Sequence, residues 1–211
     1  MHTRGRTLHF GSSYDILNRI LFLGQEDAFR EFTLGLAGIE GREEILDIGC
    51  GTGTLTILVG QKLGPRGKVC GLDTSEEMIK VARKKAKKAG LDVDFRIAAV
   101  EDMPFSSDEF DVVLSSLMFH HLPVPIKGAA ISEISRVLKA GARFILVDFD
   151  VREKSVFGGI ADVFFGKGMI RNNLTNVERC LIEEGFVDIE RNHTGFLGIS
   201  SIRAALERKD Q

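Results

Sequence analysis

The period of apolar and polar positions changes along the chain and separates predicted strands from predicted helices. Short runs rich in β-branched residues predict strands, and longer segments with apolar residues three and four positions apart predict helices. The expected strands are 44–49, 68–72, 93–98, 110–115, 142–149, 187–192 and 198–204. The expected helices are 53–63, 75–89, 125–139 and 175–184.

The helix ends have recognisable signals. Thr74 with Glu77 and Thr175 with Glu178 have the spacing of capping boxes, in which each side chain bonds the backbone of the other residue. Gly141 is expected to end the helix that precedes the fifth strand, because glycine adopts the left-handed conformation at helix C-termini.

Strands that alternate with helices imply right-handed crossovers and a mostly parallel sheet. The last two predicted strands have no helix between them, so we expect an antiparallel hairpin at one end of the sheet. The predicted fold is a doubly wound α/β domain: a mostly parallel seven-stranded sheet with helices on both faces, the last strand antiparallel.

We divide the chain into an N-terminal helical cap segment, 1–40, and a ligand-binding domain, 41–211. Within the cap, 14–36 has the pattern of one or two helices that either pack over the sheet or close over a substrate. The glycine- and phenylalanine-rich segment 151–173 is expected to be a helix or a mobile segment at the carboxyl edge of the sheet, where ligands of such folds bind.

Composition narrows the function. The chain of 211 residues can bury a core without a metal or a disulfide. A net charge of −2 argues against nucleic acid as a partner, and no apolar run reaches the length of a membrane span. The three cysteines form no CxxC pair, which argues against a zinc site and for a cytoplasmic protein; no metal is expected.

A glycine loop, Gly49-Cys50-Gly51-Thr52-Gly53, stands where the first strand meets the first helix. Glycines let the backbone approach a ligand, and the helix start offers free N–H donors to an anionic group. Asp73 ends the second strand, where a carboxylate can accept hydrogen bonds from a ribose diol. Loop and acid together indicate an adenosine-containing ligand.

The loop matches neither common nucleotide motif. A dinucleotide fingerprint requires a third glycine at the position of Thr54, and the P-loop requires a lysine that is absent here. A nicotinamide-dependent oxidoreductase is therefore kept only as an alternative.

Four segments, in order, resemble the class I S-adenosylmethionine-dependent methyltransferases, in particular those of ubiquinone and menaquinone biosynthesis. The segments are EILDIGCGTGTLT at 44–56, VCGLDTSEEMIKVARKKA at 69–86, VEDMPFSSDEFDVVLSSLMFHHL at 100–122 and ISEISRVLKAGARFILVDF at 131–149. The resemblance implies a Rossmann-like methyltransferase fold, S-adenosyl-L-methionine as the cofactor and a small molecule as the methyl acceptor. A catalytically silent, cofactor-binding regulatory protein is a second alternative.

The resemblance also implies positions for the cofactor. Its methionine end lies over the three loop glycines, its ribose at Asp73 and its adenine beside Val100. Ala99 stands where many relatives have an Asp or Asn that binds the adenine. The expected cofactor-binding residues are Asp47, Gly49, Gly51, Gly53, Asp73, Thr74, Val100, Glu101 and Ser115.

The catalytic residue stays open. Transfer of an activated methyl group needs mainly in-line alignment, and only some acceptors need a base. His121 and Asp148 are candidate bases, and Tyr14 is a candidate to close over the cofactor, although a structural role explains each of them as well. His120, Asp150 and His193 are further candidates.

Two patterns have ordinary explanations. Six basic residues within 80–88 lie opposite an apolar stripe, so we expect a solvated helix face and not a nucleic-acid site. Apolar Phe157, Ile160, Phe164 and Phe165 suggest either an apolar acceptor, such as a prenylated quinone precursor, or packing; a homodimer is left open.

Overall fold

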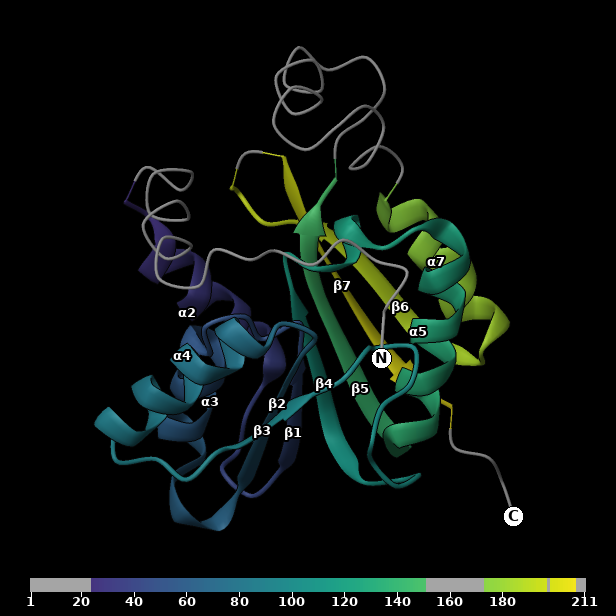
Figure 1. The fold of residues 1–211 in the computed structure, drawn as a ribbon. Coiled ribbons are helices and arrows are strands. Elements are labelled where there is room, and N and C mark those ends of the chain that lie inside the picture. The colour runs from purple at the N-terminus through teal and green to yellow at the C-terminus, as the bar shows by residue number, and fades with distance from the viewer. Residues whose placement is uncertain (1–23, 151–172, 197, 208–211) are drawn as a thin grey trace.

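The computed structural model describes residues 24–150, 173–196 and 198–207 (Figure 1). Tyr14 and the apolar residues predicted to contact the acceptor, Phe157, Ile160, Phe164 and Phe165, lie outside these ranges. The boundary between cap and domain near residue 40 stays a prediction.

Seven strands form one sheet within the described residues, in the order β3-β2-β1-β4-β5-β7-β6. The first five strands pair in parallel, and β7 is antiparallel to both β5 and β6. This arrangement confirms the predicted doubly wound fold, and it inserts β7 between β5 and β6. The strands are β1 Glu44–Ile48, β2 Lys68–Asp73, β3 Asp94–Ile97, β4 Phe110–Ser116, β5 Leu138–Phe149, β6 Phe186–His193 and β7 Ile199–Leu206.

Helices cover both faces of the sheet (Figure 1). On one face are α2 Glu26–Ala37, α3 Thr54–Leu63 and α4 Glu76–Lys88; on the other are α5 Val124–Val137 and α7 Asn173–Glu183. Short 3-10 turns are η1 Gly64–Arg66 and η2 Phe119–His121. Because apolar clusters form under both helical layers, the central strands β1 and β4 are buried on both sides, as is typical of parallel sheets.

Most predicted elements begin and end within two residues of their observed bounds, and β5 is the exception. It begins at Leu138, directly after α5, and not at 142. Gly141 therefore does not end the helix: it lies inside β5 with φ +75°, where the pairing with β4 shifts register. Leu138 leaves the helix because it is fully buried and pairs with Phe110 across the sheet.

Both predicted capping boxes are wrong in detail. Ser75, and not Thr74, caps α4: its hydroxyl accepts a hydrogen bond from the Met78 amide at 3.3 Å. Helix α7 begins at Asn173, so Thr175 lies within its first turn and its hydroxyl instead accepts a hydrogen bond from Arg191.

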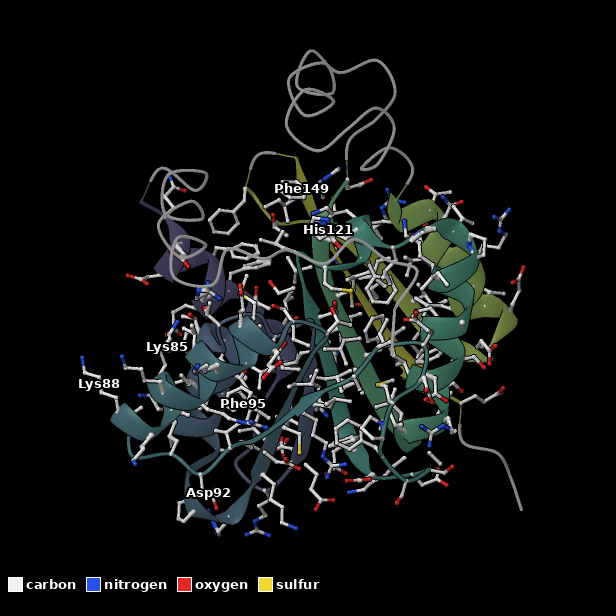
Figure 2. All side chains as sticks on the ribbon, viewed as in Figure 1. Lys85, Lys88, Asp92, Phe95, His121 and Phe149 are labelled. Carbon is white, nitrogen blue, oxygen red and sulfur yellow. The ribbon has the colours of Figure 1, made fainter. Side chains whose placement is uncertain are left out.

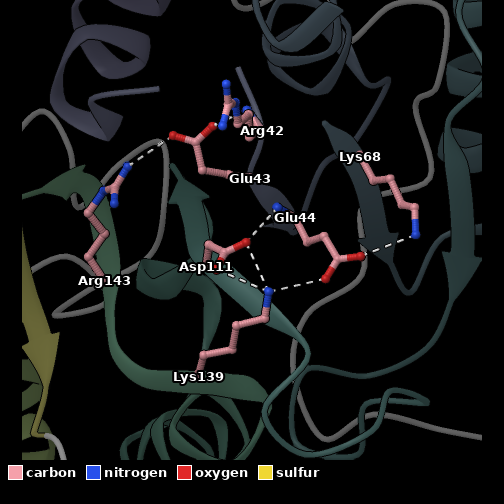
Figure 3. A network of polar contacts seen from close by, with 7 residues as sticks. All are labelled: Arg42, Glu43, Glu44, Lys68, Asp111, Lys139 and Arg143. Atoms are coloured by element: carbon pink, nitrogen blue, oxygen red, sulfur yellow. Dashed lines mark hydrogen bonds and ion pairs between the residues drawn. The ribbon is translucent and has the colours of Figure 1, made fainter. Parts of the chain in front are cut away.

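A polar network joins four strands at the amino edge of the sheet (Figure 3). The Asp111 carboxylate of β4 accepts hydrogen bonds from the Glu44 amide at 2.8 Å and from Lys139 at 3.0 Å. Glu44 also pairs with Lys139 and with Lys68 of β2, each at 3.2 Å. The network links the amino ends of these strands to one another. The loops at the opposite, carboxyl ends of the strands are not part of it and are available to bind a ligand.

Candidate active site

The glycine loop closes tightly between β1 and α3. Gly49, Gly51 and Gly53 all have positive φ, at 69°, 53° and 74°. A Cβ added at Gly49 would overlap the Met118 side chain, and one at Gly53 would lie 2.8 Å from the Ala82 Cβ. A side chain is therefore excluded at Gly49 and Gly53 both by conformation and by space.

Asp73 supports this loop from the end of β2. Its carboxylate accepts hydrogen bonds from the Gly51 amide at 2.9 Å and from the Ser75 amide at 2.8 Å. Burial raises the pKa of Asp73, although the backbone donors oppose the shift. Each oxygen keeps a second lone pair, so the same carboxylate can accept hydrogen bonds from a diol.

Asp47 is the last but one residue of β1, close to the loop, and is 2% exposed. The Thr56 hydroxyl donates a hydrogen bond to its carboxylate at 2.6 Å. Burial raises the pKa of Asp47 to about 7, and the Thr56 hydrogen bond and the nearby Arg30 charge only partly oppose this shift. An incoming cation at this position would favour the ionised carboxylate.

Some of these residues line a pocket between the carboxyl ends of β1 and β4, whereas Gly53 and Asp73 are not among its lining residues. The strand order reverses at this point, which is where ligands of doubly wound sheets bind. Asp47, Gly49 and Gly51 line the pocket, and Ser116 and Leu117 close it from β4.

Helix α2 supplies a wall of this pocket through Glu26, Phe29 and Arg30. The sequence pattern alone did not indicate that these three residues belong to the site. The local sequence predicts only an amphipathic helix. Whether its residues reach the pocket depends on how α2 packs over α3 and β4.

Leu117 is a second feature that sequence reasoning missed. It follows β4 with φ +55°, and its amide bonds the Val147 carbonyl at 2.9 Å. A non-glycine residue in this conformation is strained, and such strain is concentrated at functional sites.

The predicted cofactor residues Thr74, Val100 and Glu101 lie around the ends of β2 and β3. Val100 is buried, and Thr74 and Glu101 are partly exposed. The Ala98 amide bonds the Asp73 carbonyl at 3.2 Å, which joins the segment after β3 to the end of β2. Ser115 lies inside β4 beside Ile48 and is 1% exposed, so it borders the site from within the sheet.

His120 and Asp148 form a buried pair at the carboxyl ends of β4 and β5. His120 Nδ1 lies 2.6 Å from the Asp148 carboxylate, which also accepts the His120 amide at 3.0 Å and the Phe149 amide at 2.7 Å. Burial opposes ionisation of Asp148, but His120 and the backbone donors outweigh it and lower the carboxyl pKa. Because Asp148 is fully buried, this geometry favours a positioning role over contact with an acceptor.

His121 is the more accessible histidine of this cluster. It is partly exposed, and its ring centroid lies 3.9 Å from that of His120. Figure 2 shows His121 and Phe149 at the same carboxyl edge, and the His120 ring contacts both. Asp150 instead pairs with Arg191 at 2.6 Å, and His193 lies 3.1 Å from the Ser200 hydroxyl.

The basic face of α4 is not uniformly solvated. Lys88 is exposed, whereas Lys85 reaches the glycine loop, where its Nζ donates to the Thr52 hydroxyl at 3.1 Å and the Thr54 hydroxyl at 2.5 Å (Figure 2). Arg83 donates to the Phe95 carbonyl. Lys85 therefore supports the glycine loop, and Arg83 links α4 to β3.

Three further features of the described ranges bear on other kinds of site: metal-ligand clusters, apolar helices and cysteine thiols. No cluster of three or more His, Cys, Asp or Glu side chains is placed to hold a metal, and no described helix has the length and apolar character to cross a membrane. Burial raises the pKa of Cys50 well above its usual value and that of Cys70 to about 11, so neither thiol is an activated nucleophile.

Residues 39–192 match the family model described as a methyltransferase domain. The chain is 34% identical over 152 residues to demethylmenaquinone methyltransferase of Thermus thermophilus, a match that covers 72% of this chain and 68% of that protein. It is 30% identical to the ubiquinone/menaquinone biosynthesis C-methyltransferase UbiE of Shewanella piezotolerans, covering 75% of this chain and 63% of the relative.

Solved structures share the fold. A SAM-dependent methyltransferase from Aquifex aeolicus superimposes with a TM-score of 0.71 at 21% identity, covering 94% of this chain and all of the other. Geranyl diphosphate C-methyltransferase from Streptomyces coelicolor gives 0.70 at 18% identity, covering 87% of this chain and 77% of the other.

The glycine cradle, Asp73 and the pocket at the strand reversal suit an adenosyl ligand with an amino-acid end, and the family match selects among such ligands. The family match therefore argues against the alternative of a nicotinamide-dependent oxidoreductase. The chain belongs to the class I S-adenosylmethionine-dependent methyltransferases, which use S-adenosylmethionine as cosubstrate.

Proposed function

We propose that the protein transfers a methyl group to a ring carbon of an apolar, quinone-type small molecule in its reduced, hydroxylated form. The observation that carries this proposal is the 34% identity to demethylmenaquinone methyltransferase over 152 residues. That relative's name states the acceptor class, which we extend to this chain as a hypothesis.

The predicted cofactor residues fit the chemistry of this transfer. S-adenosylmethionine supplies a sulfonium methyl that is already activated. The glycine loop and Asp73 hold the adenosyl part, and Asp47 faces the positively charged end. Loss of the acceptor hydroxyl proton makes the ring carbon nucleophilic; a C–C bond then forms as the S–CH3 bond breaks, and the ring carbon loses its proton. Alignment of the reacting atoms contributes most of the rate.

An apolar wall beside the pocket supports an apolar acceptor. Phe29 lines the pocket and also belongs to a buried cluster with Val147, Phe149 and Ile199. The Phe196 ring packs edge-on against Phe29, with centroids 5.3 Å apart. Aromatic and aliphatic surfaces of this kind favour a flat apolar ring over a charged acceptor.

We propose that His121 removes the proton of the acceptor hydroxyl, and that His120 and Asp148 hold His121 in position. His121 is the partly exposed member of the cluster, and two hydrogen bonds from His120 to the Asp148 carboxylate hold η2 against β5. In this assignment His121 is the general base, and Asp148 is a positioning residue.

The test incubates the purified protein with labelled S-adenosylmethionine and demethylmenaquinol, and identifies the product by mass spectrometry. We expect a C-methylated ring. An O-methylated product would contradict the assignment to carbon, and S-adenosylhomocysteine binding without turnover on any quinol would support the silent regulatory alternative instead.

Two variants separate catalysis from cofactor binding. H121N should lower kcat by a factor of roughly 10²–10⁴, with unchanged affinity for S-adenosylhomocysteine. H193N serves as the matched control, because His193 is exposed on β6. Equal activity of H121N and H193N would remove His121 from the mechanism.

A further inference from the structure

The pocket carries a set of charges that the glycine loop does not explain. Three acidic or basic side chains line it: Asp47 beneath the loop, and Glu26 and Arg30 from α2. Arg30 lines the same pocket as Asp47, and its charge opposes the burial that raises the Asp47 pKa. A site built only for an adenosyl group would need no such trio.

Arg30 is held by Glu26 in an incomplete geometry. Its Nε and Nη2 both donate to the same oxygen, Glu26 Oε1, at 3.1 and 2.5 Å. A guanidinium fork normally engages both oxygens of a carboxylate in two parallel hydrogen bonds. The two side chains are 13% and 16% exposed, so their charges are partly shielded from water.

The amino-acid end of the cosubstrate has the complementary charges. Its ammonium suits Asp47, and its carboxylate is the planar, two-oxygen anion that a guanidinium binds best. We propose that Arg30 recognises this carboxylate, and that Glu26 occupies its place on Arg30 until the ligand binds. The inference rests on the cofactor site described above and is independent of the methyl acceptor.

Two consequences distinguish this exchange from a structural ion pair. Removing Arg30 must weaken only those ligands that carry the carboxylate. Removing the Glu26 charge must strengthen the binding of these ligands, because the Glu26 carboxylate then no longer competes with the ligand carboxylate for Arg30.

The experiment measures calorimetric dissociation constants for S-adenosylhomocysteine, for its decarboxylated analogue and for 5′-methylthioadenosine. We expect R30M to weaken S-adenosylhomocysteine at least 30-fold and to change the other two ligands less than twofold. R30K, which keeps the charge but loses the fork, should weaken S-adenosylhomocysteine about 5- to 10-fold. We expect E26Q to bind S-adenosylhomocysteine three- to tenfold more tightly than the parent.

The matched control is E31Q, an exposed position on the same helix, which should bind all three ligands as the parent does. Equal weakening of all three ligands by R30M and R30K would show that Arg30 only shapes the pocket and would overturn the proposal. E26Q binding no more tightly than the parent would overturn the exchange. These results do not depend on quinol turnover, whereas a parent protein that bound none of the ligands would refute the cofactor site itself.

Discussion

At the scale of single residues, Asp47 makes stability depend on pH. Burial raises its pKa to about 7, above the value of an unfolded chain, so its contribution is fully present below about pH 4 and is lost as pH rises towards 7. D47N cannot ionise and should therefore be more stable than the ligand-free parent above pH 7, by on the order of 4 kcal/mol as an upper bound. Urea unfolding between pH 5 and 8 measures the difference.

D92N is the control for that series, because Asp92 is exposed. Its stability relative to the parent should change little across the same pH range. A D47N difference that is also flat with pH would mean that Asp47 does not titrate in the folded protein.

Two glycines separate backbone strain from lack of space. Gly49 and Gly141 both have positive φ, but a Cβ at Gly49 would overlap Met118, whereas one at Gly141 would meet no atom within 4 Å. G141A should lose roughly 1–2 kcal/mol from the left-handed conformation alone. G49A should lose roughly 1–3 kcal/mol more.

Denaturant titration of the two glycine variants compares these costs. Equal losses would show that the Met118 side chain moves aside without cost. S-adenosylhomocysteine affinity should fall in G49A and stay unchanged in G141A.

Local sequence predicted part of the site. The glycine loop and Asp73 were predicted because each directly follows or ends a strand that the local apolar pattern locates. Glu26 and Arg30 were missed, since their place in the pocket depends on how α2 packs across α3 and β4. The left-handed Leu117 was missed for a similar reason: its conformation is set by a hydrogen bond to Val147 on another strand.

At the scale of elements, the amino-edge network should contribute to stability without affecting the ligand. D111A removes the acceptor of the Glu44 amide as well as the partner of Lys139. We expect a loss of about 1–2 kcal/mol, mostly from the backbone hydrogen bond, because about a third of each charged side chain is exposed and solvent screens the ion pair.

Chemical denaturation and S-adenosylhomocysteine titration of D111A test both halves of this expectation. D94A is the comparison, since it removes an exposed pair with Arg96 and should cost under about 1 kcal/mol. A change in ligand affinity in D111A would show that the two edges of the sheet are coupled.

Some ends of helices and strands could be predicted from the period of apolar residues, and others could not. Helix α4 lies within one residue of its predicted range, because its apolar stripe is regular and its ends have strong signals. The start of β5 was wrong because Leu138 continues the apolar pattern of α5 while pairing with Phe110 of β4. The pairing of Leu138 with β4 places this residue in the strand and not in the helix, and the local sequence pattern does not show that pairing.

At the scale of the whole molecule, ligand binding should stabilise the fold as a unit. At 100 times its dissociation constant, S-adenosylhomocysteine stabilises the folded protein by about 2.7 kcal/mol. For a chain of this size that corresponds to an increase in Tm of roughly 5–11 °C. Differential scanning calorimetry measures the increase, and NADH should produce none; an equal increase with NADH would reopen the nicotinamide alternative.

The class of fold was predictable because alternating strands and helices allow few arrangements. The position of β7 was not, since a hairpin at the end of a chain can join a sheet through either strand. Its burial decides the order: Ile202 and Ala204 of β7 are fully buried, whereas most residues of β6 are exposed. The more apolar strand takes the inner place.

That inner place has a consequence for synthesis. A ribosome makes β6 before β7, yet β6 borders the sheet only through β7. The nascent chain must therefore hold β6 unpaired, and leave the free edge of β5 open, until the residues of β7 emerge. Assembly of this half of the sheet follows translation of its last strand, whereas the β1–β5 half can form earlier.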